Sequence, residues 1–176
     1  ATPAVEGGFP VEIGTIVEIE AATNQDSFTI SGFEISIQQN LDFLPSPCNA
    51  MGGQINYTNV DLDSSGGFEL VEVSEDSYNI ILYYETEQIG ARAAFNSRSD
   101  YLMPGGGSFR GAERRGDDRT QLDLAFRYAV NDNMNLSLEI FNLTDEILYE
   151  YEADRNRPRN YFSYGRTISF GLRYEM

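Results

Sequence analysis

The sequence predicts an all-β chain, folded as an antiparallel, up-and-down transmembrane β-barrel of about seven or eight strands. Three observations lead to this fold class. Apolar and polar residues alternate along nearly every segment, many alternating segments are long, and the connections between them are short and long in turn. Strands in soluble domains cluster at about five or six residues, whereas about ten tilted residues are needed to cross an apolar band about 25 Å tall.

Period-two alternation marks the strands. The final segment, FSYGRTISFGLRYEM, shows it best, because Ile168, Phe170 and Leu172 fall on one face of an extended chain while Ser169 and Arg173 fall on the other. The same pattern recurs along most of the chain. Strands are expected at 27–44, 53–62, 76–86, 88–101, 119–130, 133–143 and 162–176, with a less regular one at 11–23.

The connections are sorted by length. Tight turns are expected at 86–88 and 131–133, with a slightly longer one in PSPCNAMG, whereas 63–75, 102–118 and 144–161 are long and rich in Gly, Asp, Glu and Arg. In outer-membrane barrels the tight turns face the periplasm and the long loops face outside. A soluble sandwich has no reason to sort its connections in this way.

Aromatic residues lie near strand ends, where the aromatic girdles of a membrane barrel belong. The residues in question are Tyr174, Tyr128, Tyr84, Phe43 and Tyr164. The alternative is that they fill the core of an ordinary soluble sheet, which would make the chain a β-sandwich binding module.

Composition excludes several function classes. The formal net charge of −16 argues against DNA or RNA as a partner, because phosphate binding needs clustered Lys and Arg. The chain has no histidine and a single cysteine, Cys48, so it offers no Ser-His or Cys-His pair and no cysteine-histidine zinc set. No catalytic, cofactor-binding or metal-binding residues are therefore assigned, and the chain is expected not to be an enzyme. No run of residues is apolar enough for a membrane-spanning helix.

One acidic segment has the spacing of a calcium-binding EF-hand loop. In DLDSSGGFELVE the matching positions are Asp61, Asp63, Ser65, Gly66, Glu69 and Glu72. An EF-hand loop lies between helices, however, and strands flank this one. Calcium binding and an acidic, solvated surface loop both remain open.

An arginine-rich segment, MPGGGSFRGAERRGDDR, lacks the Gly-Lys-Ser/Thr of a phosphate-binding loop and is expected to be an external loop. Arg110, Arg114, Arg115 and Arg119 are candidates to contact an anionic ligand or the phosphates of lipopolysaccharide.

From about Ser27 to Met176 the chain resembles the C-terminal part of TonB-dependent outer-membrane receptors. The resemblance rests on SFTISGFEIS, DFLP, ARAAFNSRSDYL, LDLAFRYAVNDNMNLSLEIFNLTDE and YGRTISFGLRYEM. It implies a barrel of about 22 strands, a plug domain, and uptake of a siderophore, vitamin or oligosaccharide across the bacterial outer membrane. It also implies outer-membrane lipid and lipopolysaccharide as surroundings, the barrel-assembly machinery as a reader of the last strand, and TonB as a partner through the plug, which is not recognised in this chain.

Residues 1–176 are thus expected to form a single barrel segment with a weaker N-terminal region at 1–26. A self-closed barrel of about eight strands, with a structural or adhesive role, remains the alternative. In that small barrel a set of charged residues would share the interior: Glu34, Asp42, Arg92, Arg98, Asp123, Arg127, Glu139, Arg173 and Glu175.

Overall fold

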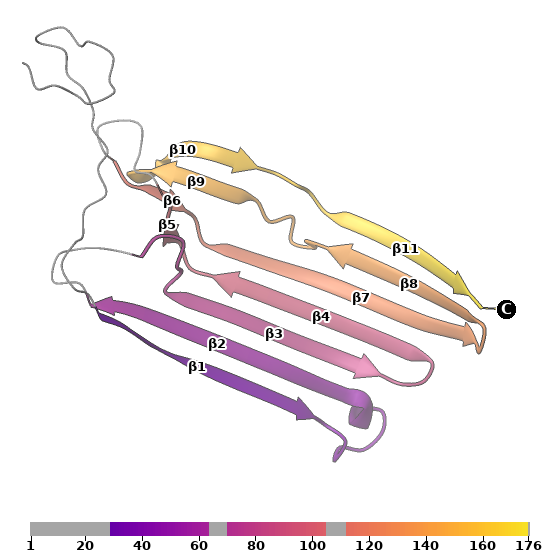
Figure 1. The fold of residues 1–176 in the computed structure, drawn as a ribbon. Helices are drawn as coiled ribbons and strands as arrows, with labels where there is room; N and C mark the ends of the chain where they lie inside the picture. The colour runs from indigo at the N-terminus through magenta and orange to yellow at the C-terminus, as the bar shows by residue number, and fades with distance from the viewer. Residues whose placement is uncertain (1–28, 64–69, 105–111, 176) are drawn as a thin grey trace, which may run out of the picture.

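A computed structural model describes residues 29–63, 70–104 and 112–175. Its largest unit, here called the main sheet, is a 7-stranded antiparallel sheet in the order β1-β2-β3-β4-β7-β8-β11 (Figure 1). The strands are β1 (Thr29–Asn40), β2 (Met51–Asp63), β3 (Asp76–Glu85), β4 (Ile89–Arg98), β7 (Arg119–Asn131), β8 (Met134–Phe141) and β11 (Thr167–Tyr174). The seven more regular strands expected from the alternation are all confirmed, with ends that differ by a few residues. The expected strand at 11–23 lies outside the described residues.

The register of the main sheet aligns residues of one kind across neighbouring strands. A continuous apolar row crosses β1, β2, β3, β4 and β7, and it consists of Ile37, Ile55, Ile80, Phe95 and Leu122. The row next to it points to the opposite face and is polar throughout: Ser36, Asn56, Asn79, Asn96 and Gln121. A slip of one residue would turn the apolar side chains of a strand to the polar face. The alternation in each strand therefore specifies the register in which it pairs with its neighbours.

The connections are sorted as the sequence predicts. Tight turns join β3 to β4 and β7 to β8 at one end of the main sheet, and the β1–β2 connection at the same end contains a short 3₁₀ helix, Cys48–Ala50 (Figure 1). Cys48 is exposed there. The long connections all leave from the opposite end of the sheet.

Two of these long connections contain strands, so the expectation of plain loops at 102–118 and 144–161 is wrong. They form a 4-stranded extension sheet in the order β10-β9-β6-β5. Its strands are β5 (Tyr101–Leu102), β6 (Arg114–Gly116), β9 (Leu148–Glu152) and β10 (Asp154–Phe162). Charged residues dominate β6 and β10, so these strands lack the apolar alternation by which a strand is recognised.

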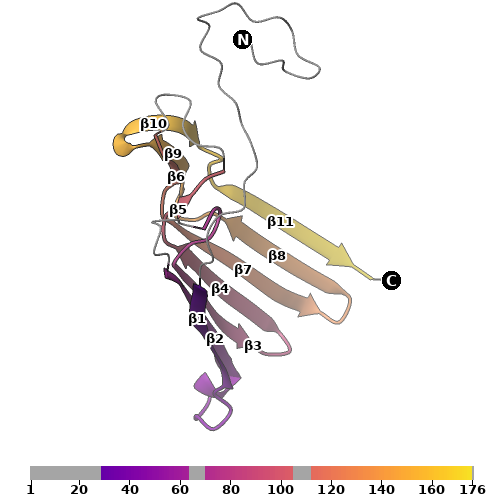
Figure 2. The ribbon, with the colours of Figure 1, turned by 60° about the vertical axis from the view of Figure 1, so that its left-hand side comes forward.

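The two sheets do not pack face to face. The extension sheet continues beyond the long-connection end of the main sheet (Figures 1 and 2). In the described part of the chain only one hydrophobic residue, Tyr101, is buried. This arrangement overturns the alternative of a soluble β-sandwich, which requires two sheets pressed together around an apolar core.

The main sheet curls across its width, since Figure 2 shows β1 and β2 nearly edge-on while β8 and β11 lie broadside. β1 and β11 are its edges, and no pairing between them occurs among the described strands. The self-closed small barrel is therefore not what these strands form. Across the described ranges, no helix combines the length and apolarity of a membrane span.

Candidate functional faces of the sheet

One face of the main sheet is apolar and lies open. Phe170 is 82% exposed and Leu172 67% exposed on β11, and Ile37 and Leu82 are likewise exposed on β1 and β3. Monomeric soluble proteins rarely expose apolar patches that extend across several strands. An exposed apolar surface of this extent is typical of a site that contacts a membrane or another protein.

Aromatic side chains border the apolar face at both ends. Of the five expected girdle residues, four lie at the tight-turn end: Phe43, Tyr84, Tyr128 and Tyr174. Tyr164 lies at the other end, between β10 and β11, and its ring stacks on that of Phe162 at 6.2 Å. Sequence reasoning missed a second group at the long-connection end, where Tyr57 stacks on Tyr78 at 4.7 Å and Phe33 meets Tyr57 edge to face at 5.5 Å.

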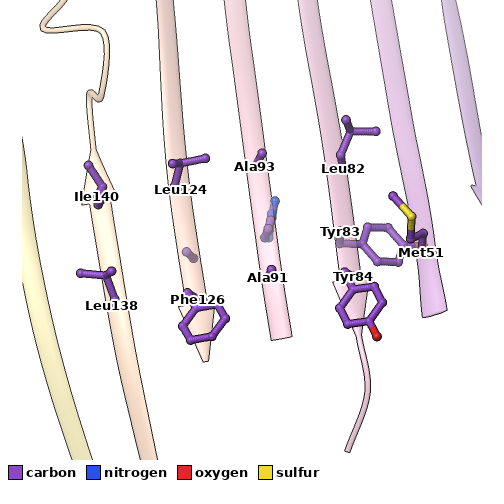
Figure 3. A pocket seen from close by; sticks show the side chains of 12 residues that line it. Met51, Leu82, Tyr83, Tyr84, Ala91, Ala93, Leu124, Phe126, Leu138 and Ile140 are labelled. Atoms are coloured by element: carbon purple, nitrogen blue, oxygen red, sulfur yellow. The ribbon is translucent and has the colours of Figure 1, made fainter. Parts of the chain in front are cut away.

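The centre of the apolar face contains a shallow hollow of about 350 Å³ (Figure 3). Ala91 and Ala93 on β4 form its floor, between Leu82 on β3 and Leu124 and Phe126 on β7. Small side chains in the middle strand leave this space, and only apolar groups could fill it without losing hydrogen bonds to water.

The opposite face carries hydrogen-bonding side chains in cross-strand rows. Ser36 donates a hydrogen bond to the Asn56 side chain at 2.7 Å, and the Asn79 amide donates to Asn96. Such neutral polar groups suit a surface in contact with water or a polar ligand.

Close to the long-connection end the polar face is hollowed by a groove of about 430 Å³, here called the arginine groove. Two arginines, Arg98 and Arg119, stand opposite each other on β4 and β7 and line it. Arg98 is half-buried and lies over the Tyr101 ring, with its guanidinium carbon 4.4 Å from the ring centre. Arg119 donates to the Gln121 side chain at 2.6 Å.

The remaining charged residues of the polar face are spread out rather than brought together. Arg127 pairs with Glu85 at 3.1 Å, and a second hollow of about 510 Å³ near them is lined by Arg92 and Glu139. Of the set expected in an interior, the following occupy polar-face positions in the strands: Glu34, Arg92, Arg98, Asp123, Arg127, Glu139 and Arg173. Asp42 and Glu175 lie just beyond strand ends, where Glu175 pairs with Arg173 at 2.5 Å.

Asn142 joins the main sheet to the connections beyond it. This residue of the NLTDE segment is 3% exposed and has a positive φ of 57°. Its amide donates to the carbonyls of Glu146 and Gly165 at 3.0 and 3.2 Å and accepts the Glu146 N–H at 2.8 Å, and its own N–H donates to Asp123 at 2.8 Å. The NLTDE segment, which is part of the resemblance to TonB-dependent receptors, thus links the end of β8 to the start of the connection to β11.

Ion pairs hold the extension sheet. Glu150 is buried, pairs with Arg114 and accepts from Asn160 at 2.6 Å. Arg115 pairs with Asp100 at 2.9 Å. Burial and the nearby Asp100 carboxylate raise the pKa of the Tyr151 hydroxyl above its usual range. Of the four arginines expected to contact anions, Arg114 and Arg115 are therefore occupied by carboxylates, Arg119 lines the arginine groove, and Arg110 lies outside the described residues.

The predicted calcium loop falls mostly outside the described residues. Asp61 lies in β2, the Asp63 backbone ends that strand, and Glu72 belongs to the next described stretch, while Ser65, Gly66 and Glu69 are not described. In the described ranges no group of three or more His, Cys, Asp or Glu is placed to hold a metal ion. Calcium binding stays a prediction.

Comparisons with known proteins agree with a barrel wall. A family model described as "TonB dependent receptor-like, beta-barrel" matches residues 7–143. No curated protein matches the chain.

Among solved structures, the chain is similar to the pyoverdine outer-membrane receptor FpvA from Pseudomonas aeruginosa PAO1, bound to pyoverdine, with a TM-score of 0.62 and 16% identity. The match covers 85% of this chain and 22% of that one, so the chain spans about a fifth of the length of the receptor it resembles. At this identity the likeness establishes the fold.

Proposed function

Because this chain belongs to the TonB-dependent receptor-like β-barrel family, we propose that it forms part of the wall of a receptor barrel that takes up a nutrient across the bacterial outer membrane. In this role the apolar face contacts lipid and the polar face lines the transport path. The tight turns lie at the periplasmic end and the extension sheet at the outer end.

The observation that carries the proposal is the contrast between the two faces of a single sheet. Within hydrocarbon every backbone N–H and C=O needs a partner inside the protein, and a continuous antiparallel ladder supplies them. The apolar side chains remain exposed in the described chain because no second sheet covers them. A lipid bilayer provides the cover that the protein itself does not.

The family supplies the remaining parts of the proposal. Receptors of this kind are energised by TonB through a plug domain, and their strands are inserted by the barrel-assembly machinery. We place the chain in the outer membrane beside lipopolysaccharide, as one barrel segment, and assign it no catalytic residue. Its ligand belongs to the class of siderophores, vitamins and oligosaccharides that such receptors transport.

Two neighbouring alanines on β4 test the assignment of the faces. Ala93 lies on the apolar face, in register with Leu82 and Leu124, and Ala94 lies on the polar face, in register with Ile81 and Asp123. Ala93→Arg places a charge in lipid and should cost about 2–4 kcal/mol of folding free energy near the bilayer midplane. Ala94→Arg should cost less than about 1 kcal/mol, because its guanidinium can reach Asp123 and water.

The measurement is the amount of intact receptor in outer-membrane fractions, together with the temperature at which it loses resistance to unfolding in SDS. Since both variants replace alanine by arginine in adjacent positions, size and helix or strand propensity are matched. Equal tolerance of both substitutions, or greater tolerance of Ala93→Arg, would contradict the proposed orientation of the wall.

A further inference from the structure

Arg98 and Arg119 stand out because no described residue carries a charge that pairs with theirs. They end β4 and begin β7 as direct cross-strand partners, an arrangement in which like charges repel. Within the described ranges neither makes an ion pair, and each keeps a buried Nε atom without a hydrogen-bond partner. This is unexpected in a chain with 28 acidic and 12 basic residues.

Among the described residues, the groove around the two arginines offers neutral hydrogen-bonding groups and no carboxylate. Its other polar lining side chains on this face are Asn56, Thr58, Ser77, Asn79, Asn96 and Gln121. A volume of about 430 Å³ falls within the range of small-molecule sites. The groove therefore combines net positive charge with room for a ligand and with amide and hydroxyl groups to orient it.

Both guanidinium groups are held in place by buried neighbours. Arg98 donates to the Tyr101 hydroxyl at 3.1 Å, and Tyr101 is only 8% exposed. Gln121, which is 9% exposed, accepts from Arg119 and donates to Asp123 at 2.9 Å, so an amide separates Arg119 from the neighbouring carboxylate. Cations fixed in this way bind an anion at little additional cost in side-chain entropy.

We propose that the arginine groove binds an oxyanion, a carboxylate or phosphate group of a soluble ligand, held by Arg98 and Arg119 together. A guanidinium fork matches both groups in a bidentate geometry, and an anion between the arginines would relieve their mutual repulsion. The inference rests on the proposed function, because it places the site on the face that lines the transport path. The groove lies at the long-connection end of the main sheet (Figure 1), which the proposed function places toward the outside.

The test uses the intact receptor purified from outer membranes in detergent. Citrate is the carboxylate probe and inorganic phosphate the phosphate probe, each titrated calorimetrically at low ionic strength, with glycerol as the neutral control. Arg98→Gln and Arg119→Gln should each weaken binding of the preferred anion by about tenfold or more, because each removes a charge-assisted contact but keeps a polar side chain of similar reach.

Arg127→Gln is the matched control, since Arg127 lies on the same face but already pairs with Glu85. It should change the affinity by less than about twofold, since Arg127 lies eight residues from Arg119 along β7 and water weakens the interaction between charges that far apart. Arg98→Lys adds a second comparison: it keeps the charge and loses the planar fork, and it should bind more weakly than the wild type but more tightly than Arg98→Gln.

Three results would overturn the inference. The wild-type receptor could bind neither anion, the two glutamine variants could bind as tightly as the wild type, or all arginine variants, including Arg127→Gln, could weaken binding equally. If the wild type binds nothing while both glutamine variants lose thermal stability, an acidic segment of the receptor fills the groove instead. Each of these outcomes leaves the wall assignment intact, because the Ala93 and Ala94 variants test that assignment separately.

Discussion

The strands of the extension sheet are inserted between those of the main sheet along one chain, yet different forces hold the two sheets. The main sheet keeps its register across each pairing, with one shift between Ala129 and Asn131. The extension sheet shifts register twice along β9 and β10 and depends on pairs such as Arg114 with Glu150. Its central residue Glu150 is a buried charge, while the main sheet buries no charged side chain within the described residues.

This difference matches the two surroundings that the proposed function assigns to the sheets. A strand in hydrocarbon has no water to satisfy an irregular backbone, so its ladder must be continuous. A strand beyond the membrane can bulge and let side chains or water complete its hydrogen bonds. The continuous ladder of the main sheet ends at Asn142 after β8, and at Arg98 and Arg119 at the corresponding ends of β4 and β7.

The largest effect is expected at the junction of the two regions. Asn142→Ala removes the amide that bonds Glu146 and Gly165 and places alanine at a φ of 57°. We expect a loss of about 3 kcal/mol or more in the free energy of unfolding, because buried backbone groups lose their partners and the backbone is strained. Urea unfolding of the receptor in detergent micelles measures it.

Asn135→Ala is the control for the junction, because Asn135 lies near the start of β8, at the opposite end of the strand from Asn142, and makes no side-chain hydrogen bond that the junction needs. Its expected cost is below about 0.5 kcal/mol. A junction variant as stable as this control would show that the two sheets are connected by the strands alone.

A smaller and more local effect is expected within the extension sheet. Glu150→Ala leaves Arg114 and Asn160 without their shared acceptor and should cost about 2 kcal/mol, reduced from the value for a fully buried pair because Arg114 is partly exposed. Hydrogen exchange should rise in β6, β9 and β10 but not in the main sheet. Glu113→Ala, at an exposed pair with Arg115, serves as the control and should cost less than about 0.5 kcal/mol.

Exchange that rises equally in both sheets after Glu150→Ala would show that they unfold as one unit, which would contradict the view that different forces hold them. Exchange that rises only in the extension sheet would support that view.

The smallest effects come from one contact that both sheets share, a tyrosine ring lying over a glycine. A Cβ at Gly52 would meet the Tyr83 ring at 2.3 Å, and one at Gly116 would meet the Tyr101 ring at 2.5 Å. Gly52→Ala should cost about 1 kcal/mol, since the exposed end of Tyr83 can move away from its bond to Asn40. Gly116→Ala should cost about 1.5 kcal/mol, because Tyr101 is buried and its ring cannot move away.

Thermal unfolding of the two alanine variants, alone and combined with removal of the facing ring, measures these contacts as coupling energies. Gly90→Ala provides the reference, since its nearest heavy atom would be the flexible Arg127 side chain at 3.4 Å. A larger coupling energy between Gly52 and Tyr83 than between Gly116 and Tyr101 would contradict the expectation that the Tyr101 ring is the more rigid of the two.

The sequence predicted the structure correctly in strands whose residues alternate regularly between an apolar and a polar face. Alternation placed the strands of the main sheet, because apolar residues recur at every second position within a strand, as Tyr78, Ile80 and Leu82 do in β3, and therefore share one face. It failed in β6, which consists of two arginines and a glycine, and in β10, where arginines alternate with Asn156 and Pro158, because no apolar residue recurs at every second position there. It placed the start of a strand at Arg119 correctly, but it grouped Arg119 with Arg114 and Arg115 as contacts for one anion, although Arg119 lines a groove that the other two do not.

By itself the sequence determined the period, and with it the two faces, the strand lengths and the sorting of the connections, because each of these depends on residues close together in the chain. Only the tertiary structure decided which side chains become neighbours. Arg98 and Arg119 meet because strands β4 and β7 pair in one register, and Asn142 reaches Gly165 because β11 returns beside β8. Such contacts join residues far apart in the sequence, and their position is set by hydrogen-bond ladders whose register depends on the whole sheet.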